Sequence, residues 1–550
     1  MSIATPTAVA RILKAEGVEW VSTFPVCHVN NALAAEGLRL VMMRDERYAV
    51  AVADAFGRVT AGQRPAVCTV MGGTNPAGVQ MAYGALAQAY EDSSPLLCLA
   101  EGIAPGDPAT PRYELERSLA TVTKWVGQIS APEQTPQVLR RAFHLLRNGR
   151  PGPVAVTILR GLGDYDEAQH PYAPAPRVRS APDPADVRAA VTALRGARAP
   201  LLYAGEGVLY AGAVDALRAL AEAAALPVLT TLKGKSAFAE HHPLSLGVRG
   251  EAAIAYLRRC DVLLAVGTSL SRGHFRHTIP GAARKVIIHA TNDPGDLNRT
   301  YAASQALLGD ARLTLEALAA ELARQGGPGA WQAASGQVAA DREAALAPYR
   351  ALFDAAETPI NPYRVYGELM RLLDPQASFV SGDSGSTRDQ LSTVYRAGAP
   401  RSFLGWGNVS TLGFSLAAAV AARLAHPTWP CVAVAGDAGV GYMAGNLEPL
   451  VRCRLGVTIV HINNGGFAGY GPGFWGPGHD PYTCAVLDHT VAHWADAAAS
   501  LGLHAERVLA PDAIAPALQR ALGANAKGQP ALLEIICSQY PVFGAWATAE

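Results

Sequence analysis

Two polar turns in the last third of the chain carry oxygen-bearing side chains directly after apolar runs. Asp437 follows the run Cys431 to Gly436, and Asn464 follows the run Val457 to Asn463. One helical segment separates the runs, so we expect parallel neighbouring strands whose carboxyl ends bring both turns to the edge where open α/β sheets bind ligands. Asp437, Asn464 and the backbone carbonyl of Gly466 offer hard oxygen atoms, which Mg²⁺ prefers.

Small residues beside Asp437 favour a phosphate group as the partner of this cation. Gly436, Ala438 and Gly439 leave room for backbone N–H groups to approach a phosphate at the start of the following helix. The alternative is that Gly-Asp and Asn-Asn-Gly-Gly are ordinary turn sequences. Their occurrence as a pair, with one crossover helix between them, favours a Mg²⁺-dependent cradle for a diphosphate.

The turns need a scaffold, which the apolar runs of the whole chain predict. Short Val-, Ile- and Leu-rich runs alternate with Ala-rich helical segments, which is typical of parallel sheets covered on both faces. The expected strands are Ala66 to Val70, Leu96 to Leu99, Val154 to Ile158, Leu201 to Gly205, Pro227 to Thr231, Val262 to Gly267, Val286 to Ala290, Cys431 to Asp437, Val457 to Asn464 and Ala531 to Ile536. We predict an α/β fold of three doubly wound parallel-sheet domains at residues 1–165, 185–325 and 359–545, with linkers at 166–184 and 326–358.

Composition limits the classes of partner. The 550 residues contain 46 Lys and Arg and 46 Asp and Glu, so no charge excess points to nucleic acid or a membrane surface, and a small-molecule substrate is expected. No run reaches the roughly 18 apolar residues of a membrane span. The first residues lack the pattern of a leader sequence, and we therefore expect a cytoplasmic protein. The eight cysteines form no CxxC pair or zinc spacing and are expected to be reduced.

The paired turns resemble the metal-binding signature of thiamine diphosphate enzymes, in which Gly-Asp-Gly precedes a strand that ends in Asn-Asn. Ala438 stands at the third position of the first motif. The resemblance implies that Asp437, Asn464 and the Gly466 carbonyl hold Mg²⁺ against the diphosphate of the cofactor. It makes the three domains pyrimidine-binding, central Rossmann-like and diphosphate-binding. The other residues along the bound cofactor would be Gly436, Ala438, Gly439 and Phe467.

A segment near the beginning of the chain supports the same cofactor. MMRDERYAVAVADAFGRVTAG resembles the RHEQGAxxAAxGYARxTG segment of the acetolactate synthase and pyruvate decarboxylase group. Glu46 takes the position of the glutamate that activates the cofactor through a hydrogen bond to N1′ of the aminopyrimidine. The resemblance also implies a homodimer or homotetramer in which Glu46 reaches across a subunit interface. The alternative for Glu46 is a surface charge.

Two segments of the last region extend the resemblance. SGDSGST is similar to the turn that gives hydroxyl groups to the diphosphate, and it points to Ser384 and Ser386. GNVSTLGFSLAAAVAA is similar to GxxMGxxxPAAIGA, which places Leu412 beneath the bent cofactor and the Ser410 carbonyl near its amino group. Plain core packing is the alternative for Leu412.

The middle region resembles the same group, because LKGKSAFAEHHPLSLG is similar to GKGxFPExHPLxLG. In some members this domain binds FAD or the ADP part of coenzyme A, and which of these applies here stays open. A phosphate loop at Gly234 to Ser236 is excluded, since Leu229 occupies the earlier glycine position. A dinucleotide fingerprint fails at Tyr210 for the same reason.

Substrate choice is expected to depend on two segments that depart from the family patterns. FPVCHVNNAL occupies the loop that is PGG or PGD in the group, and it places Cys27 and His28 near the reacting carbon. His28 is either an acid or base in catalysis or a hydrogen-bonded structural histidine. The segment FAGYGPGFWGPGHDPYT after the second turn forms either a lid and substrate wall or a loop that packs on the sheet. The remaining candidate substrate contacts are Gln80, Tyr470, Trp475 and His479.

The resemblance implies a thiamine diphosphate- and Mg²⁺-dependent enzyme similar to acetolactate synthase. Such an enzyme decarboxylates a 2-oxo acid and joins the remaining fragment to an acceptor, and the cofactor supplies the bond-breaking chemistry. Simple decarboxylation and 2-hydroxyacyl-CoA or oxalyl-CoA lyase reactions are alternatives. A catalytically silent regulatory subunit is an alternative of another class, against which the joint presence of Glu46, Asp437 and Asn464 argues.

Overall fold

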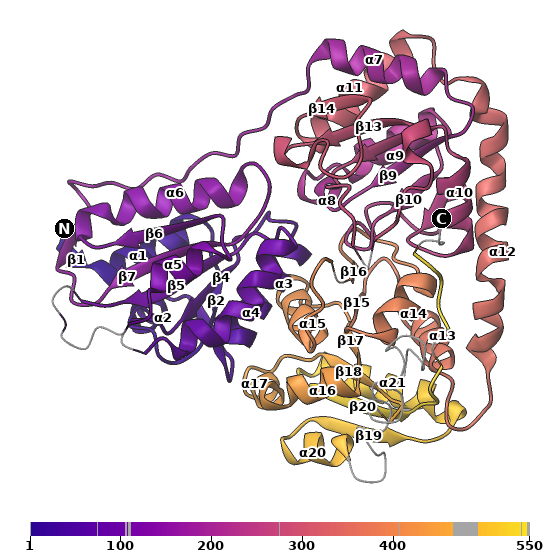
Figure 1. Ribbon diagram of the computed structural model, residues 1–550. Helices are drawn as coiled ribbons and strands as arrows, with labels where there is room; N and C mark the ends of the chain where they lie inside the picture. Colours follow the sequence, from indigo (N-terminus) through magenta and orange to yellow (C-terminus); the bar gives the residue numbers. More distant parts are fainter. Residues whose placement is uncertain are drawn as a thin grey trace. The chain divides into compact units, whose positions relative to one another are not determined.

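The apolar runs form strands in a computed structural model, which describes residues 2–73, 75–104, 107, 112–273, 276–405, 407–465, 493–540 and 542–546. The described residues contain three parallel six-stranded sheets (Figure 1). A small antiparallel pair joins β1 (Ser2–Ala4) to β8 (Asp164–Asp166). The prediction of an α/β fold with three doubly wound parallel-sheet domains is confirmed.

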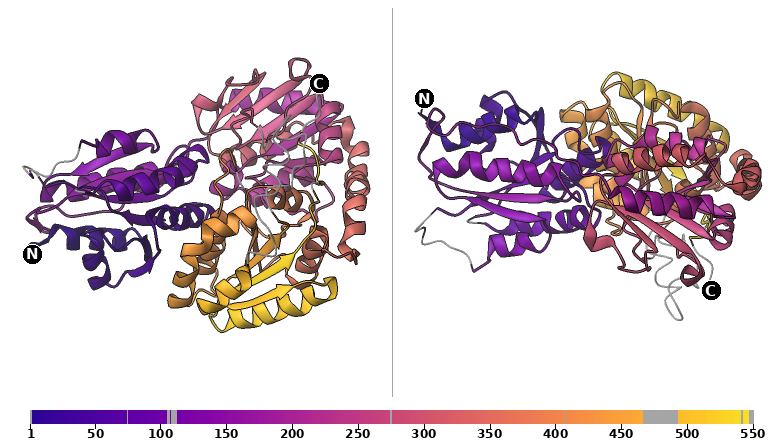
Figure 2. Two further views of the ribbon diagram at one scale, coloured as in Figure 1. Left: turned by 60° about the horizontal axis from the view of Figure 1, so that its bottom comes forward. Right: turned by 90° about the horizontal axis from the view of Figure 1, so that it is seen from above.

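The first sheet has the strand order β3-β2-β4-β5-β7-β6. Its strands are β2 (Trp20–Thr23), β3 (Arg39–Met42), β4 (Val67–Val70), β5 (Leu97–Gly102), β6 (Trp125–Ile129) and β7 (Val154–Leu159). Its helices are α1 (Thr5–Ala15), α2 (Asn30–Ala35), α3 (Glu46–Val59), α4 (Ala77–Glu91), α5 (Leu115–Ala120) and α6 (Thr135–Arg147). α1 packs with α6, and α3 packs with α4. Figure 2 shows this indigo and purple sheet with helices on both sides.

Apolar side chains explain why these helices cover the sheet. Val9 and Leu13 of α1 and Phe143 of α6 are buried in one core with strand residues of β4, β5 and β7. α3 is buried along nearly its whole length, because it packs on the sheet, on α4 and on α15 (Phe414–Ala425). The many alanines of α3 and α15 allow the two helices to approach closely.

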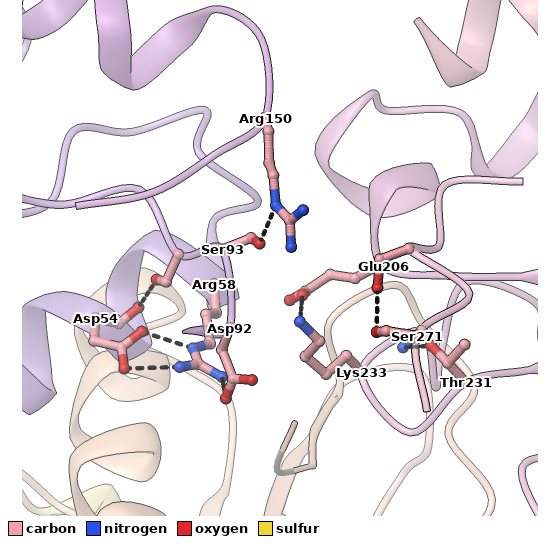
Figure 3. Close-up of polar contacts among 12 residues, drawn as sticks. Asp54, Arg58, Asp92, Ser93, Arg150, Glu206, Thr231, Lys233 and Ser271 are labelled. Atoms are coloured by element: carbon pink, nitrogen blue, oxygen red, sulfur yellow. Dashed lines mark hydrogen bonds and ion pairs between the residues drawn. The ribbon is translucent and has the colours of Figure 1, made fainter. Parts of the chain in front are cut away.

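A buried ionic network joins α3 to the end of α4 (Figure 3). Arg58 donates Nε–H to Asp54 Oδ1 at 2.6 Å and Nη2–H to Asp54 Oδ2 at 2.8 Å, while its Nη1 lies 3.1 Å from Asp92 Oδ2. Gln88 donates to Asp54 Oδ2 at 3.1 Å. All three charged side chains are at most 1 % exposed, so each charge depends on the others for stabilisation.

Replacing Arg58 by alanine is expected to destabilise the first domain by about 3–5 kcal/mol, because two carboxylates would be left buried without their cation. The measurement is urea unfolding followed by circular dichroism. Arg117→Ala is the control, since the Arg117 side chain is 81 % exposed and pairs only on the surface with Glu114. Equal unfolding midpoints for the two variants would show that the network contributes nothing to stability.

The central sheet has the strand order β11-β10-β9-β12-β13-β14. Its strands are β9 (Pro200–Ala204), β10 (Val228–Thr230), β11 (Ser245–Gly247), β12 (Val262–Val266), β13 (Val286–Thr291) and β14 (Gln305–Leu308). Its helices are α7 (Pro184–Arg195), α8 (Gly207–Tyr210), α9 (Val214–Ala223), α10 (Glu251–Arg259), α11 (Ala311–Arg324) and α12 (Val338–Arg350). α7, α9 and α11 pack together over one core, and α10 and α12 pack together over another.

The third sheet has the strand order β16-β15-β17-β18-β20-β19. Its strands are β15 (Phe379–Gly382), β16 (Phe403–Leu404), β17 (Cys431–Gly436), β18 (Thr458–Asn463), β19 (His504–Val508) and β20 (Ala531–Ile536). The helices between them are α13 (Pro362–Leu372), α14 (Ser386–Val394), α15, α16 (Asp437–Met443), α17 (Leu447–Arg452), α20 (Trp494–Ser500) and α21 (Ile514–Ala526).

By their contacts the described residues form two compact units. The first contains residues 1–178, 409–427 and 443–455, so α15 and α17 belong with the first sheet, and the second contains the remaining residues. Within the described ranges, no helix combines the length and the apolar character needed to cross a membrane. Every cysteine in the part of the chain that the structure describes is a free thiol.

Candidate active site

The carboxyl edge of the third sheet carries the residues predicted to bind a diphosphate and its cation. β15, β17 and β18 are adjacent and parallel, so the turns that follow them share one edge. Asp437 follows β17 and is buried, and Asn464 follows β18 and donates its backbone N–H to Asp437 Oδ2 at 3.3 Å. The structure thus brings together two predicted ligands that lie 27 positions apart in the sequence.

A histidine that the sequence analysis did not single out holds the other oxygen of Asp437. His461, on β18, donates Nε2–H to Asp437 Oδ1 at 2.9 Å. Its side chain is fully buried, and its Nδ1 has no hydrogen-bond partner. A polar residue inside the otherwise apolar run VTIVHINN was the only sequence signal for this contact. His461 fixes the orientation of the Asp437 carboxylate, as outer partners of metal ligands commonly do.

The predicted diphosphate turn lies on the same edge. Ser384 and Ser386 follow β15 and are half-buried, and the Ser384 N–H donates to the buried Asp383 at 2.9 Å. An added Cβ at Gly439 of α16 would lie 2.8 Å from Asp383 Oδ1, so the turn after β15 packs tightly on the start of α16. The two predicted hydroxyl groups therefore belong to the same edge as Asp437.

The donor set at this edge fits a hard cation bound to a diphosphate. Asp437 supplies a carboxylate, Asn464 an amide oxygen, and the adjoining start of α16 supplies backbone N–H groups. An added Cβ at Gly436 would meet nothing within 4 Å, so the turn has open space beside it. Among the described residues there is no group of three or more His, Cys, Asp or Glu side chains that could hold a metal by themselves. A cation here would need the phosphate oxygens as well.

Glu46 lies at the carboxyl edge of the first sheet, as the first residue of α3. Asp45 caps the helix by accepting the Tyr48 N–H at 2.8 Å, and Asn446 donates to the second oxygen of Asp45 at 2.8 Å. Glu46 is 5 % exposed, yet its Oε1 has no hydrogen-bond partner. An added Cβ at Gly78 would lie 2.6 Å from this oxygen, so only glycine leaves it room. A buried carboxylate oxygen without a donor is the feature expected where a bound group completes the hydrogen bonding.

The environment of Glu46 favours its neutral form. Burial raises the pKa of the Glu46 carboxyl, the negative charge of Asp45 raises it further, and a backbone N–H at the helix start opposes both. A raised pKa makes the carboxyl a better proton donor than an ordinary glutamate, which suits a role in activating a heterocyclic nitrogen.

Glu46→Gln is expected to raise the melting temperature of the cofactor-free protein at pH 8 relative to wild type. The folded-state pKa of Glu46 is raised, so its contribution to stability is complete below the unfolded pKa and is lost as pH rises through the folded value. Glutamine avoids this loss, and the difference between variant and wild type should shrink towards about pH 4, where the carboxyl is protonated. Thermal melting at several pH values tests this; a difference that does not change with pH would contradict it.

The Ser410 to Gly413 segment is held against the helix that begins with Glu46. Arg47 donates Nη2–H to the Leu412 carbonyl at 2.5 Å, and Tyr48 donates its hydroxyl to the Gly413 carbonyl at 2.7 Å. Gly413 has φ +85°, a conformation that glycine adopts without strain, and it precedes α15. Leu412 and Ser410 are half-buried and belong to the first unit, and the Leu412 carbonyl contacts α3.

The first-domain loop predicted to face the substrate meets two charged residues that the sequence analysis missed. His28 Nδ1 lies 3.7 Å from Glu101 Oε2, and Arg160 donates Nη2–H to the same oxygen at 2.7 Å. Glu101 is the residue before the last of β5, and Arg160 directly follows β7. Burial raises the pKa of the neighbouring Cys27 thiol to about 12, so Cys27 is a neutral thiol near pH 7. The sequence signal for Glu101 was a carboxylate between Ala100 and Gly102, at the end of an apolar strand.

The remaining predicted residues are Gln80 and a group that the structure does not describe. Gln80 is exposed on α4. The other candidates lie outside the described residues, and these are Gly466, Phe467, Tyr470, Trp475 and His479, with the rest of the segment 467–483.

Glycines of the central sheet serve close packing. Added Cβ atoms at Gly205 and Gly207 would lie 2.2 Å and 2.7 Å from backbone atoms of Gly267, so the turns after β9 and β12 require small residues to pass each other. Glu206 between these glycines is paired with Lys233 at 3.5 Å (Figure 3) and with Arg401 at 3.0 Å. Close packing thus accounts for Gly205 and Gly207 of AGEGVLYAG, and a bound nucleotide is not needed to explain them.

Comparison with known proteins gives three matches to models of thiamine pyrophosphate enzymes. The N-terminal TPP binding domain matches residues 4–114, the central domain residues 187–318, and the C-terminal TPP binding domain residues 383–535. A probable acetolactate synthase large subunit of Methanocaldococcus jannaschii is 28 % identical over 96 % of this chain and 91 % of its own. A probable 2-ketoarginine decarboxylase of Pseudomonas aeruginosa is 32 % identical over 80 % of this chain and 78 % of its own. An acetolactate synthase of Mycobacterium bovis is 30 % identical over 83 % of this chain and 75 % of its own.

Proposed function

This chain belongs to the thiamine pyrophosphate enzymes, and on that premise we propose that it decarboxylates a 2-oxo acid and joins the remaining fragment to a carbonyl acceptor. Membership makes it a thiamine diphosphate-dependent enzyme that forms or breaks C–C bonds. The observation that carries the proposal is Glu46, a buried carboxyl whose Oε1 lacks a partner at the position of the cofactor-activating glutamate.

Each cluster has a separate part in holding the cofactor. Glu46 would bind N1′ of the aminopyrimidine, and Leu412 would support the bent cofactor. Asp437, Asn464 and the Gly466 carbonyl would hold Mg²⁺ against the diphosphate. The serines after β15, Ser384 and Ser386, would add hydroxyl groups to it. When bound, thiamine diphosphate supplies the carbon nucleophile that reacts with a carbonyl group.

The protein's own contribution is orientation and proton handling. Glu46 holds or gives a proton at Oε1, and the raised pKa of its carboxyl favours this exchange. His461 orients Asp437 through the 2.9 Å hydrogen bond. The assembly in this account is a homodimer or homotetramer in which Glu46 of one subunit serves the cofactor held by another.

Carboligation is favoured by the relatives named acetolactate synthase, one of which aligns over 96 % of this chain. A second candidate is decarboxylation without an acceptor. It is favoured by the contact of His28 with Glu101, which offers a place to hold a proton, and by the relative named for decarboxylation of a 2-oxo acid.

A screen of 2-oxo acids tests the proposal and separates the two candidates. The purified chain, with thiamine diphosphate and Mg²⁺, is incubated with single 2-oxo acids, then with pairs and with added aldehydes, and the products are identified by mass spectrometry. Products as large as two joined fragments, formed only with cofactor, support carboligation. Aldehydes one carbon shorter than the acid, with no joined product, support decarboxylation alone. Absence of any product from all acids contradicts both.

A further inference from the structure

Three buried polar atoms at the carboxyl edge of the first sheet have no hydrogen-bond partner. They are Oε1 of Glu101 and both ring nitrogens of His28. The Glu101 side chain is only 1 % exposed, so water does not replace the missing contacts. Buried polar atoms in native proteins nearly always have partners, so these three atoms mark a place where a ligand completes the bonding.

The position of Glu101 relates these atoms to the cofactor-activating glutamate. Gly73, in the turn after β4, and Gly78, in the first turn of α4, lie close to the two carboxylates. An added Cβ at Gly73 would lie 3.2 Å from Glu101 Oε1, and one at Gly78 would lie 2.6 Å from Glu46 Oε1. Both carboxylates therefore lie at the ligand-binding edge of a single sheet, close to glycines that follow β4.

Arg160 fixes the charge and the orientation of Glu101. Burial alone would raise the pKa of the Glu101 carboxyl, but the nearby His28 ring and the hydrogen bond and positive charge of Arg160 outweigh burial and lower it. Glu101 is therefore ionised near neutral pH, with Oε2 held at 2.7 Å by Arg160 Nη2. A carboxylate oxygen 3.7 Å from Nδ1 of His28 favours the ring tautomer that carries its proton on that nitrogen.

We propose that Glu101 is a positioning residue that keeps a proton on Nδ1 of His28, so that Nε2 of His28 exchanges a proton with the keto oxygen of the 2-oxo acid. The inference rests on the proposed function. The proton comes from a ring protonated at both nitrogens. As the carbonyl carbon is attacked, the Nε2–H bond breaks and the π electrons of the C=O bond form an O–H bond, which leaves a neutral ring with its proton on Nδ1. When the product leaves, this O–H bond breaks, its electrons restore a C=O bond, and the proton returns to Nε2. The exchange needs no oxidant, reductant or further reactant.

Among the described groups near His28, Glu101 is the one that can hold the proton on Nδ1. Glu101 lies against the ring itself, and the neighbouring Cys27 interacts with Glu101, Arg160 and the strand cysteines Cys68 and Cys98. Burial raises the pKa of Cys27 to about 12 and that of Cys68 well above its ordinary value, so both are neutral thiols. Among these groups of the described chain, Glu101 is the anion.

The first test observes His28 directly in the full-length protein without cofactor. Histidines are labelled with ¹⁵N, and the His28 ring signals are identified by their loss in His28→Gln. In wild type we expect the Nδ1–H tautomer. In Glu101→Gln we expect a mixture of tautomers, because the carboxylate that faces Nδ1 is gone. Glu114→Gln, the same change at an exposed site of the same domain, should match wild type.

The second test measures turnover of a 2-oxo acid by the holoenzyme across a pH range. Glu101→Gln should lower kcat by ~10-fold or more with little change in KM, and its activity should fall at lower pH than that of wild type. Glu101→Asp, which keeps the charge, should recover most of kcat. His28→Gln should no longer show this fall of activity with pH. If Glu101→Gln fails to fold, His28→Gln alone tests whether His28 takes part in the proton exchange.

Two results would overturn the inference alone. One is an active Glu101→Gln with the tautomer, kcat and pH profile of wild type. The other is a His28→Gln that keeps the wild-type fall of activity with pH. Wild-type protein that turns over no 2-oxo acid would instead contradict the proposed function on which the inference rests.

Discussion

Replacement of Glu46 by glutamine is expected to lower kcat by about 10²- to 10⁴-fold, the range typical for loss of a proton-transfer group. Glutamine keeps the size of the side chain and fits beside Gly78, whose added Cβ would lie only 2.6 Å from Oε1. It cannot ionise, so it cannot exchange a proton with the cofactor. The fold should persist, because Asp45 and Asn446 hold the start of α3 independently of Glu46.

Turnover and cofactor affinity must be measured separately for this variant. We expect Mg²⁺-dependent binding of thiamine diphosphate, measured by isothermal titration calorimetry, to stay within a few-fold of wild type. Glu133→Gln is the matched control, since Glu133 is exposed in the same domain and should leave kcat unchanged. A Glu46→Gln enzyme with wild-type kcat would remove Glu46 from the chemistry.

The second large effect is expected at Asp437. Asp437→Asn keeps the shape of the side chain but removes the charge that faces the cation, and the Mg²⁺-dependent affinity for thiamine diphosphate should fall by more than ~100-fold. His461→Gln should have a smaller effect, roughly 10- to 100-fold, because His461 acts through Asp437 by the 2.9 Å hydrogen bond. Calorimetric titration of thiamine diphosphate at several Mg²⁺ concentrations distinguishes the two.

The control for this series is Asp512→Asn, the same chemical change at an exposed position before α21. It should bind the cofactor like wild type. If Asp437→Asn also binds like wild type, the metal is not held at the edge where β17 and β18 end, and Asn464 loses its proposed role as well.

The third sheet shows how far the sequence could predict the site. Apolar runs followed by Gly-Asp and by Asn-Asn indicated adjacent parallel strands, and β17 and β18 are adjacent, with Asp437 and Asn464 in contact. Asn463 and Asn464, however, have different contacts. Asn463 donates to the buried Glu534 at 2.8 Å and thereby ties β18 to β20. Local sequence does not reveal this division, because the partner lies on a strand far along the chain.

The contacts of His461 and Glu101 were missed for the same physical reason. Each lies in a strand whose local pattern is apolar or small, and each acquires its meaning from a residue brought close only by folding. Glu101 meets Arg160, 59 positions later, because β5 and β7 are neighbours in the sheet. Periodicity predicts that strands form but gives no order of strands within a sheet, so such pairs become visible only in the structure.

The hydrophobic periodicity of the sequence also could not predict that α15 packs on α3. Both helices are rich in alanine and both were expected to cover sheets, yet residues 409–427 group with the first unit, and Arg47 and Tyr48 bind the Leu412 and Gly413 carbonyls. The predicted role of Leu412 came from resemblance alone. The hydrogen bonds to α3 supply a physical reason for its placement beside the helix of Glu46.

Release of carbon dioxide from a labelled substrate tests the central claim most directly. A set of 2-oxo acids carrying ¹³C at the carboxyl carbon is incubated with the full-length protein, and ¹³CO₂ is measured in the gas phase by mass spectrometry. We predict release from at least one acid that requires both thiamine diphosphate and Mg²⁺ and that is lost in Glu46→Gln. Release that is independent of the cofactor, or no release from any acid by a protein shown to bind the cofactor, would contradict the account.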